Sequence, residues 1–251
     1  RRTGIGVAIA RRLLEPGASV LAHHYRAHDA DQPWGSDDIT TVLDELTEHQ
    51  SVHGNPEARL ADCGLDLAEP GAPERLVETA QATFGHLDIC VANHARSHPD
   101  GALGDLTTDI LDGHWAVDAR SAILLAQAFA ARHDDARPGG RIVFLTSGQH
   151  LGPMPGEVAY AAAKTALAGI TPTLADQLAD RGITLNTVNP GPVDTGYATE
   201  AHRRALAARF PEGRWAHPDD PTRLIAWLCT DDAAWITGQT INTEGGFRRW
   251  N

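Results

Sequence analysis

The chain has 251 residues, and its 42% hydrophobic content is sufficient for one large buried core. Its 21 basic and 33 acidic residues give a formal net charge of −12, which disfavours nucleic acid and other strongly anionic partners. No apolar run approaches the roughly 20 residues that span a bilayer, so we expect no membrane segment. Cys63, Cys90 and Cys229 lack Cys-x-x-Cys spacing, which favours a reducing, cytoplasmic location over a disulfide framework.

Strands and helices alternate along the chain, which is the pattern of a parallel sheet covered by helices on both faces. The predicted strands are residues 19–23, 59–67, 87–92, 141–147 and 183–188. The predicted helices are residues 8–14, 39–48, 73–84, 111–132 and 160–181. We therefore expect one α/β domain over residues 1–251, built on a doubly wound parallel sheet.

Three residues carry the strongest chemical signal. Tyr160 and Lys164 are four positions apart in an alanine-rich stretch, so their side chains share one helix face. An ammonium beside a phenol favours the phenolate, which makes Tyr160 a candidate general acid. Ser147 comes thirteen positions before Tyr160, at the carboxyl end of a predicted buried strand, where open α/β sheets bind ligands. A lone Tyr-x-x-x-Lys also arises by chance, and it is this surrounding pattern that favours catalysis.

Together with other motifs, these residues resemble the short-chain dehydrogenase/reductase family, and within it the 3-oxoacyl-(acyl carrier protein) reductases. The motifs appear in family order over nearly the whole chain: Gly4-Ile5-Gly6, Asp66-Leu67, residues 87–95, Ser147, Tyr160, Lys164, Pro190-Gly191, Thr195, residues 236–239 and residues 244–246. The resemblance implies a Rossmann-type fold, a nicotinamide cofactor and reduction of a carbonyl group.

The resemblance also implies a role for each matching residue. Ser147 would hydrogen-bond the substrate carbonyl, Tyr160 would protonate it, and Lys164 would also hold the ribose hydroxyls. Gly4 and Gly6 lack Cβ atoms and would let a pyrophosphate approach the following helix. The expected cofactor-binding residues are Gly4, Ile5, Gly6, Arg26, Asp66, Leu67, Asn93, Ala95, Tyr160, Lys164, Pro190, Gly191, Val193 and Thr195.

The residues that follow strand 19–23 determine the choice between NAD and NADP. No acidic residue follows that strand before Asp29, and Arg26 is suited to a phosphate group. We therefore expect NADPH to be preferred to NADH. In the alternative, Arg26 points to water and Asp29 folds back to the ribose.

Two residues depart from the family pattern. Asp118 stands where relatives carry an asparagine that supports a proton-returning water chain, and we count it with the catalytic residues. Its carboxylate would hold the Lys164 ammonium and oppose the phenolate, or it is a near-isostere of asparagine, paired with Arg120. His94 lies within the motif of residues 87–95 and either contacts the substrate or fills space.

The N-terminal end and two irregular stretches also depart from a regular alternation of strands and helices. Because relatives begin with a hydrophobic strand, we expect that first strand, about a dozen residues with its turn, to precede Arg1. Residues 28–38 would form a surface insertion, and residues 195–215 a substrate-closing loop, a pair of surface helices, or both.

The expected substrate is a small carbonyl compound, since the net charge disfavours docking of an acidic acyl carrier protein. The resemblance implies a homotetramer through residues 111–132 and 160–181. The alternatives are a non-redox scaffold or cyclase with this fold, and an NAD-dependent alcohol dehydrogenase.

Overall fold

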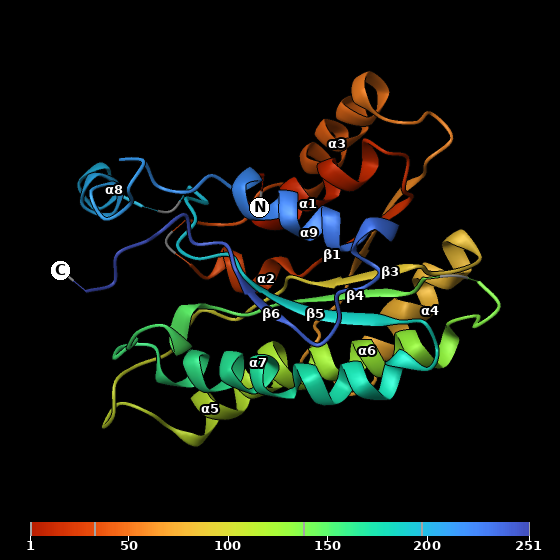
Figure 1. The fold of residues 1–251 in the computed structure, drawn as a ribbon. Coiled ribbons are helices and arrows are strands. Elements are labelled where there is room, and N and C mark those ends of the chain that lie inside the picture. Colours follow the sequence, from red (N-terminus) through yellow and green to blue (C-terminus); the bar gives the residue numbers. More distant parts are fainter. Residues whose placement is uncertain (1, 33, 138, 197, 251) are drawn as a thin grey trace. The chain divides into compact units, whose positions relative to one another are not determined.

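The computed structural model describes residues 2–32, 34–137, 139–196 and 198–250 (Figure 1). Its strands are β1 (Val20–His24), β2 (Leu60–Gly64), β3 (Ile89–Ala92), β4 (Arg141–Leu145), β5 (Thr184–Asn189) and β6 (Thr240–Asn242). Its α-helices are α1 (Ile5–Leu14), α2 (Arg26–Ala30), α3 (Ile39–His53), α4 (Ala72–Phe84), α5 (Thr108–His114), α6 (Ser121–Arg132), α7 (Val158–Ala179), α8 (Glu200–Ala207) and α9 (Asp219–Leu228).

The chain divides into two compact units. The first comprises residues 1–66, 192–226 and 245–248, and the second comprises residues 67–191, 227–244 and 249–251. The described strands form two parallel sheets, β1-β2 in the first unit and β3-β4-β5-β6 in the second.

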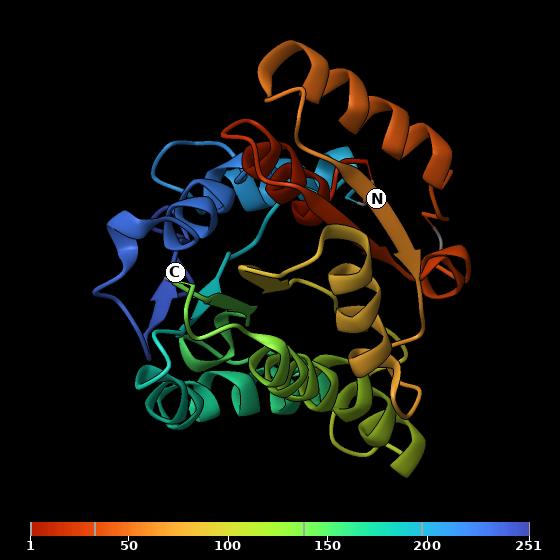
Figure 2. The same ribbon diagram turned by 90° about the vertical axis from the view of Figure 1, so that its right-hand side faces the viewer.

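The first unit contains the β1-β2 pair, whose register runs from Val20 opposite Leu60 to His24 opposite Gly64. Helices α1 and α3 pack together through a core that includes Leu14 and Leu46 (Figure 2). The Asp38 carboxylate caps the N-terminus of α3 by accepting backbone N–H groups of the first turn.

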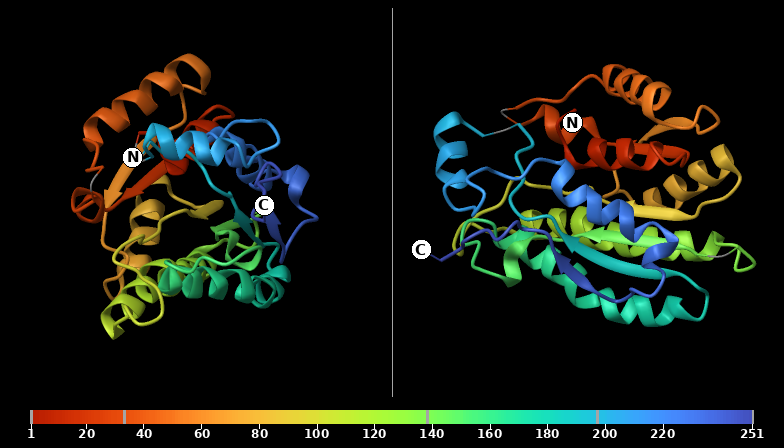
Figure 3. Two further views of the ribbon diagram at one scale, coloured as in Figure 1. Left: turned by 90° about the vertical axis from the view of Figure 1, so that its left-hand side faces the viewer. Right: turned by 45° about the horizontal axis from the view of Figure 1, so that its top comes forward.

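The second unit is built around β4 and β5, in which every residue is buried. Burial along the whole length is typical of parallel strands that are covered on both faces. Helices α6 and α7 run along one face of this sheet (Figures 1 and 3). The large core side chains Phe129, Phe144 and Leu167 lie in this unit and are almost completely buried.

The predicted helix 111–132 differs most from the structure. Its place is taken by α5, the π-helical segment η1 (Trp115–Arg120) and α6. A π-helical turn contains an additional residue and rotates the side chains that follow it, and such turns are frequent at functional sites.

The two stretches that were expected to be irregular both contain helical residues. Residues 28–38, of which residue 33 lies outside the described residues, include the end of the short helix α2. Residues 195–215, of which residue 197 also lies outside, contain α8, and Phe210 and Trp215 are buried beside it. This favours the surface-helix interpretation, with one helix instead of two. Among the described residues, no helix is both long and apolar enough to cross a membrane.

Candidate active site

Tyr160 and Lys164 lie on the first turns of α7, as their spacing predicts. Lys164 is only 2% exposed, and its Nζ donates a hydrogen bond to the carbonyl of Leu145 at 3.0 Å. The same Nζ lies 5.7 Å from the centre of the Tyr160 ring. The ammonium therefore reaches from α7 to the end of β4 and passes beside the phenol.

Burial lowers the pKa of Lys164 from its ordinary value, and the carboxylate of Asp118 opposes that shift. Burial removes water from the ammonium and disfavours its charged form. A phenolate beside it would stabilise that positive charge and would be stabilised by it. The site thereby contains a buried cation next to a candidate proton donor. Perturbed lysines of this kind are characteristic of functional sites.

Ser147 lies two residues beyond β4, in extended backbone just before the 3-10 turn η2 (Gly148–His150). The preceding residue, Thr146, donates its hydroxyl to the carbonyl of Lys164 at 2.8 Å. This bond fixes the segment after β4 to α7, so the segment that carries Ser147 meets the helix that carries Tyr160 and Lys164. Ser147 Oγ contacts the sulfur of Met154 at 3.9 Å.

The first turn of α7 has a capping residue that is distant in sequence. Glu157 precedes the helix and makes no side-chain cap. Instead, Asp100 accepts the backbone N–H of Ala159 at 3.0 Å and of Tyr160 at 2.8 Å. Burial opposes ionisation of Asp100, but backbone donors and His114 keep its pKa below the ordinary value.

Asp118 lies in η1 and is completely buried. Its Oδ2 lies 2.9 Å from Nδ1 of His114, and its Oδ1 accepts the backbone N–H of Arg96 at 2.6 Å. The predicted pairing with Arg120 is wrong, because Arg120 donates to the carbonyl of Ala68. Residues two positions apart on a helix point in different directions, whereas the spacing of His114 and Asp118 brings side chains together.

The first unit contains the residues expected around the pyrophosphate. Gly4 precedes α1 and gives its first turn no side-chain cap. Ile5 and Gly6 follow it in the helix, and the hydroxyl of Thr3 donates to the carbonyl of Thr195 at 2.8 Å. The expected pyrophosphate turn and the expected nicotinamide contact are thus neighbours within this unit.

The remaining expected residues of the first unit lie at several places. Arg26 is exposed at the first residue of α2, and Asp29 lies on the same helix. Asp66 follows β2, and Val193 is buried and bridges to Ala216.

In the second unit, Asn93 and Ala95 follow β3, and Leu67 is buried. Pro190 and Gly191 follow β5. Gly191 has a φ of +69°, and a Cβ there would approach the Cα of Glu244 to 3.0 Å, so only glycine suits this turn. His94 Nε2 contacts the hydroxyl of Ser121 at 2.6 Å, which favours a structural role over a substrate contact.

Comparison with known proteins identifies the family of the chain. The family model described as enoyl-(acyl carrier protein) reductase matches residues 1–248. The chain belongs to the short-chain dehydrogenase/reductase family. It is 40% identical to the oxidoreductase YjdA of Bacillus subtilis, over 98% of this chain and 92% of that protein.

Two solved structures of reductases that act on keto groups are also similar. LugOII, a promiscuous reductase of lugdunomycin biosynthesis, is 31% identical with a TM-score of 0.82, covering 98% of this chain and 94% of its own. LanV, an angucycline C-6 ketoreductase with bound NADP, is 30% identical with a TM-score of 0.82. The match covers 98% of this chain and 91% of LanV. The expected Rossmann-type α/β fold is confirmed, and the chain is an oxidoreductase that uses a nicotinamide cofactor.

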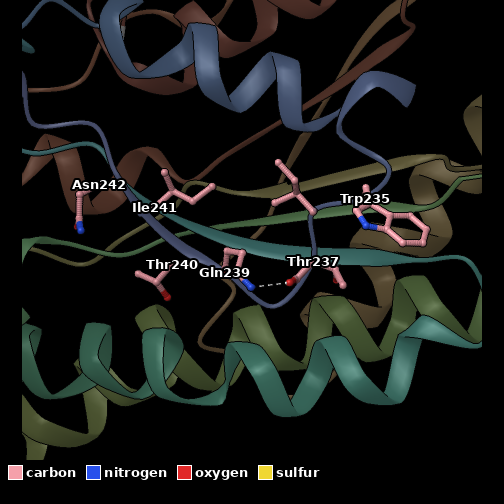
Figure 4. Close-up of a pocket in the computed structure, with 7 residues that line it drawn as sticks. Trp235, Thr237, Gln239, Thr240, Ile241 and Asn242 are labelled. Atoms are coloured by element: carbon pink, nitrogen blue, oxygen red, sulfur yellow. Dashed lines mark hydrogen bonds between the residues drawn. The ribbon is translucent and has the colours of Figure 1, made fainter.

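A pocket elsewhere in the second unit is separate from the candidate catalytic residues. It lies along β6 and includes the exposed ring of Trp235 (Figure 4). Ser147, Tyr160 and Lys164 do not line it.

Proposed function

We propose that this short-chain dehydrogenase/reductase reduces a ketone or β-keto group of a small molecule to a secondary alcohol, with NADPH as the hydride donor. The observation that carries the proposal is the buried Lys164 ammonium beside the Tyr160 ring, at the end of the strand that leads to Ser147. The keto-reduction named for LugOII and LanV supports the same reaction class.

The residues of the chain fit a nicotinamide dinucleotide. The first turn of α1 has N–H groups without a side-chain cap, which suits a pyrophosphate. Pro190 and Gly191 follow the carboxyl end of β5, where open α/β sheets bind ligands. The cofactor, when bound, supplies the hydride that becomes the new C–H bond of the product.

The remaining steps belong to side chains of the chain. Tyr160 donates its hydroxyl proton to the carbonyl oxygen as that oxygen gains negative charge. Ser147 donates a hydrogen bond to the same oxygen and stabilises the charge. The Lys164 ammonium stabilises the phenolate left on Tyr160, which must regain a proton before the next turnover.

Arg26 supports NADPH over NADH, because it is exposed at the start of α2 and β1 contains no acidic residue. The NADP bound to LanV supports the same preference. The free thiols of Cys63, Cys90 and Cys229 fit a cytoplasmic enzyme. A homotetramer also belongs to the proposal, whereas docking of an acyl carrier protein remains disfavoured by the charge of −12.

The test is oxidation of NADPH, followed by absorbance, with a panel of ketones and β-ketoesters. We expect turnover of at least one compound and a secondary alcohol as product. Tight NADPH binding without turnover of any carbonyl compound would instead support a non-redox scaffold or cyclase.

A further inference from the structure

A buried histidine, His114, lies one helical turn before Asp118 in the catalytic part of the second unit. Neither side chain has any exposed surface. Nδ1 of His114 lies 2.9 Å from Oδ2 of Asp118, and Nε2 lies 3.0 Å from the carbonyl oxygen of Pro99. The His114 ring also meets the Tyr160 ring edge-on, with centroids 6.2 Å apart. The pair therefore adjoins the candidate proton donor.

The contacts of His114 determine the charge of the pair. A backbone carbonyl can only accept a hydrogen bond, so Nε2 carries a proton and donates it to Pro99. One further proton then lies between Nδ1 and the Asp118 carboxyl. It gives a cation and a carboxylate when it is on the ring, and two neutral groups when it is on the carboxyl. The net charge of the pair is zero in both cases.

We propose that His114 is a positioning residue that neutralises Asp118, so that the pair brings no net charge to the surroundings of Lys164 and Tyr160. This inference rests on the proposed function, because it concerns proton transfer by Tyr160. Without His114, a lone buried carboxylate would face the Lys164 ammonium. Such a carboxylate would hold the ammonium and oppose formation of the Tyr160 phenolate.

The surrounding groups do not provide the same compensation. Asp100 lies 3.8 Å from Nε2 of His114 and adds negative charge. Burial and the nearby Asp100 raise the pKa of Glu157. Glu157 adds no positive charge in either protonation state. The other titratable groups are His94, Arg96, His98 and Asp105 on the loop after β3, and Tyr160, Lys164 and Asp176 on α7. Asp105 and Asp176 are acidic, and His94 contacts the hydroxyl of Ser121.

Arg96 contributes its backbone N–H to Asp118, while its side-chain Nε donates to the carbonyl of His98. Lys164 is the cation whose charge Tyr160 needs. His114 is therefore the side chain whose removal exposes the charge of Asp118.

The test is a double-mutant cycle with His114→Leu and Asp118→Asn. In the Asp118→Asn background, the amide can accept the N–H of Arg96 and donate to Nδ1 of His114, so a neutral imidazole suffices there. We expect His114→Leu to lower kcat/KM by about tenfold or more in the wild-type background. We expect the alkaline limb of its pH-rate profile to move up by about one unit. The same change should cost less than about threefold when Asp118→Asn is present.

Thermal unfolding of the same four proteins gives a readout that needs no substrate. His114→Leu should lower the Tm by about 4 °C or more, and Asp118→Asn should recover part of that loss. If the wild-type enzyme reduces no carbonyl compound, the proposed function fails, but the melting cycle still tests the neutral pair.

The matched control is His133→Leu. His133 is also buried, but it stacks on Phe129 beyond the end of α6. It should lower the Tm and leave the pH-rate profile unchanged. Equal losses from His114→Leu with and without Asp118→Asn, in both kcat/KM and Tm, would show a packing role only and overturn the proposal.

Discussion

The Asp100 carboxylate accepts the backbone N–H of Tyr160 at 2.8 Å. Sixty residues separate the two in sequence, yet this bond fixes the first turn of α7 to the loop after β3. The helix that carries the candidate acid is therefore capped by a side chain that also adjoins His114. Proton donor, cap and buried pair form one connected cluster.

The first prediction concerns this cap. Asp100→Ala removes the acceptor of the Gly101, Ala159 and Tyr160 N–H groups, and we expect a loss of about 1–2 kcal/mol in the free energy of unfolding. Denaturant unfolding measures that loss, and kcat should fall more than the affinity for NADPH. Asp105→Ala in the same loop, where the side chain is exposed, is the control and should behave as wild type.

The second prediction separates the acid from its neighbour. Tyr160→Phe keeps the ring and removes the proton donor, so carbonyl reduction should fall by about 10²- to 10⁴-fold with NADPH affinity nearly unchanged. Lys164→Ala should reduce both the rate of carbonyl reduction and the affinity for NADPH. Isothermal titration and steady-state kinetics provide the two measurements. A wild-type rate for Tyr160→Phe would refute the assignment of Tyr160 as the acid.

Much of the fold could be predicted because its signals are local. The hydrophobic run of β4 and the spacing of Tyr160 and Lys164 are each contained within a few residues. The capping bond from Asp100 could not be predicted, since no local pattern links residues so far apart. The π-helical segment η1 was missed because residues 111–132 show a continuous helical pattern that does not reveal the additional residue.

The buried pair was missed for a different reason. The thirteen histidines show no metal-ligand spacing, and His114 has no motif of its own. Its position four residues before Asp118 was a usable signal, because such residues face each other on a helix. Arg120 is nearer to Asp118 in sequence, but residues two positions apart do not face each other on a helix.

The third prediction concerns cofactor preference. The wild-type enzyme should prefer NADPH to NADH, and Arg26→Ala should weaken that preference mainly through the KM for NADPH, by about tenfold, since it removes a charged hydrogen bond to the 2′-phosphate. The KM for NADH is the internal control and should stay constant. Asp29→Ala tests the alternative, in which NADH binding would suffer instead. Equal use of both cofactors by the wild-type enzyme would contradict the assignment of Arg26.

The last prediction concerns the cost of the buried Lys164 ammonium. Because burial lowers its pKa in the folded state, the unfolded chain binds more protons between the folded and unfolded pKa values, and stability rises with pH there. The penalty is fully present below the folded pKa and disappears as pH reaches the unfolded value. Lys164→Met removes the charge while keeping an apolar stem of similar length. We therefore expect an inactive protein whose Tm at neutral pH is higher by about 2–4 °C, with a gain that shrinks in alkaline buffer. Differential scanning calorimetry across pH measures this gain. A gain that grows with pH would show that the Leu145 and Asp118 contacts already offset the burial of the ammonium.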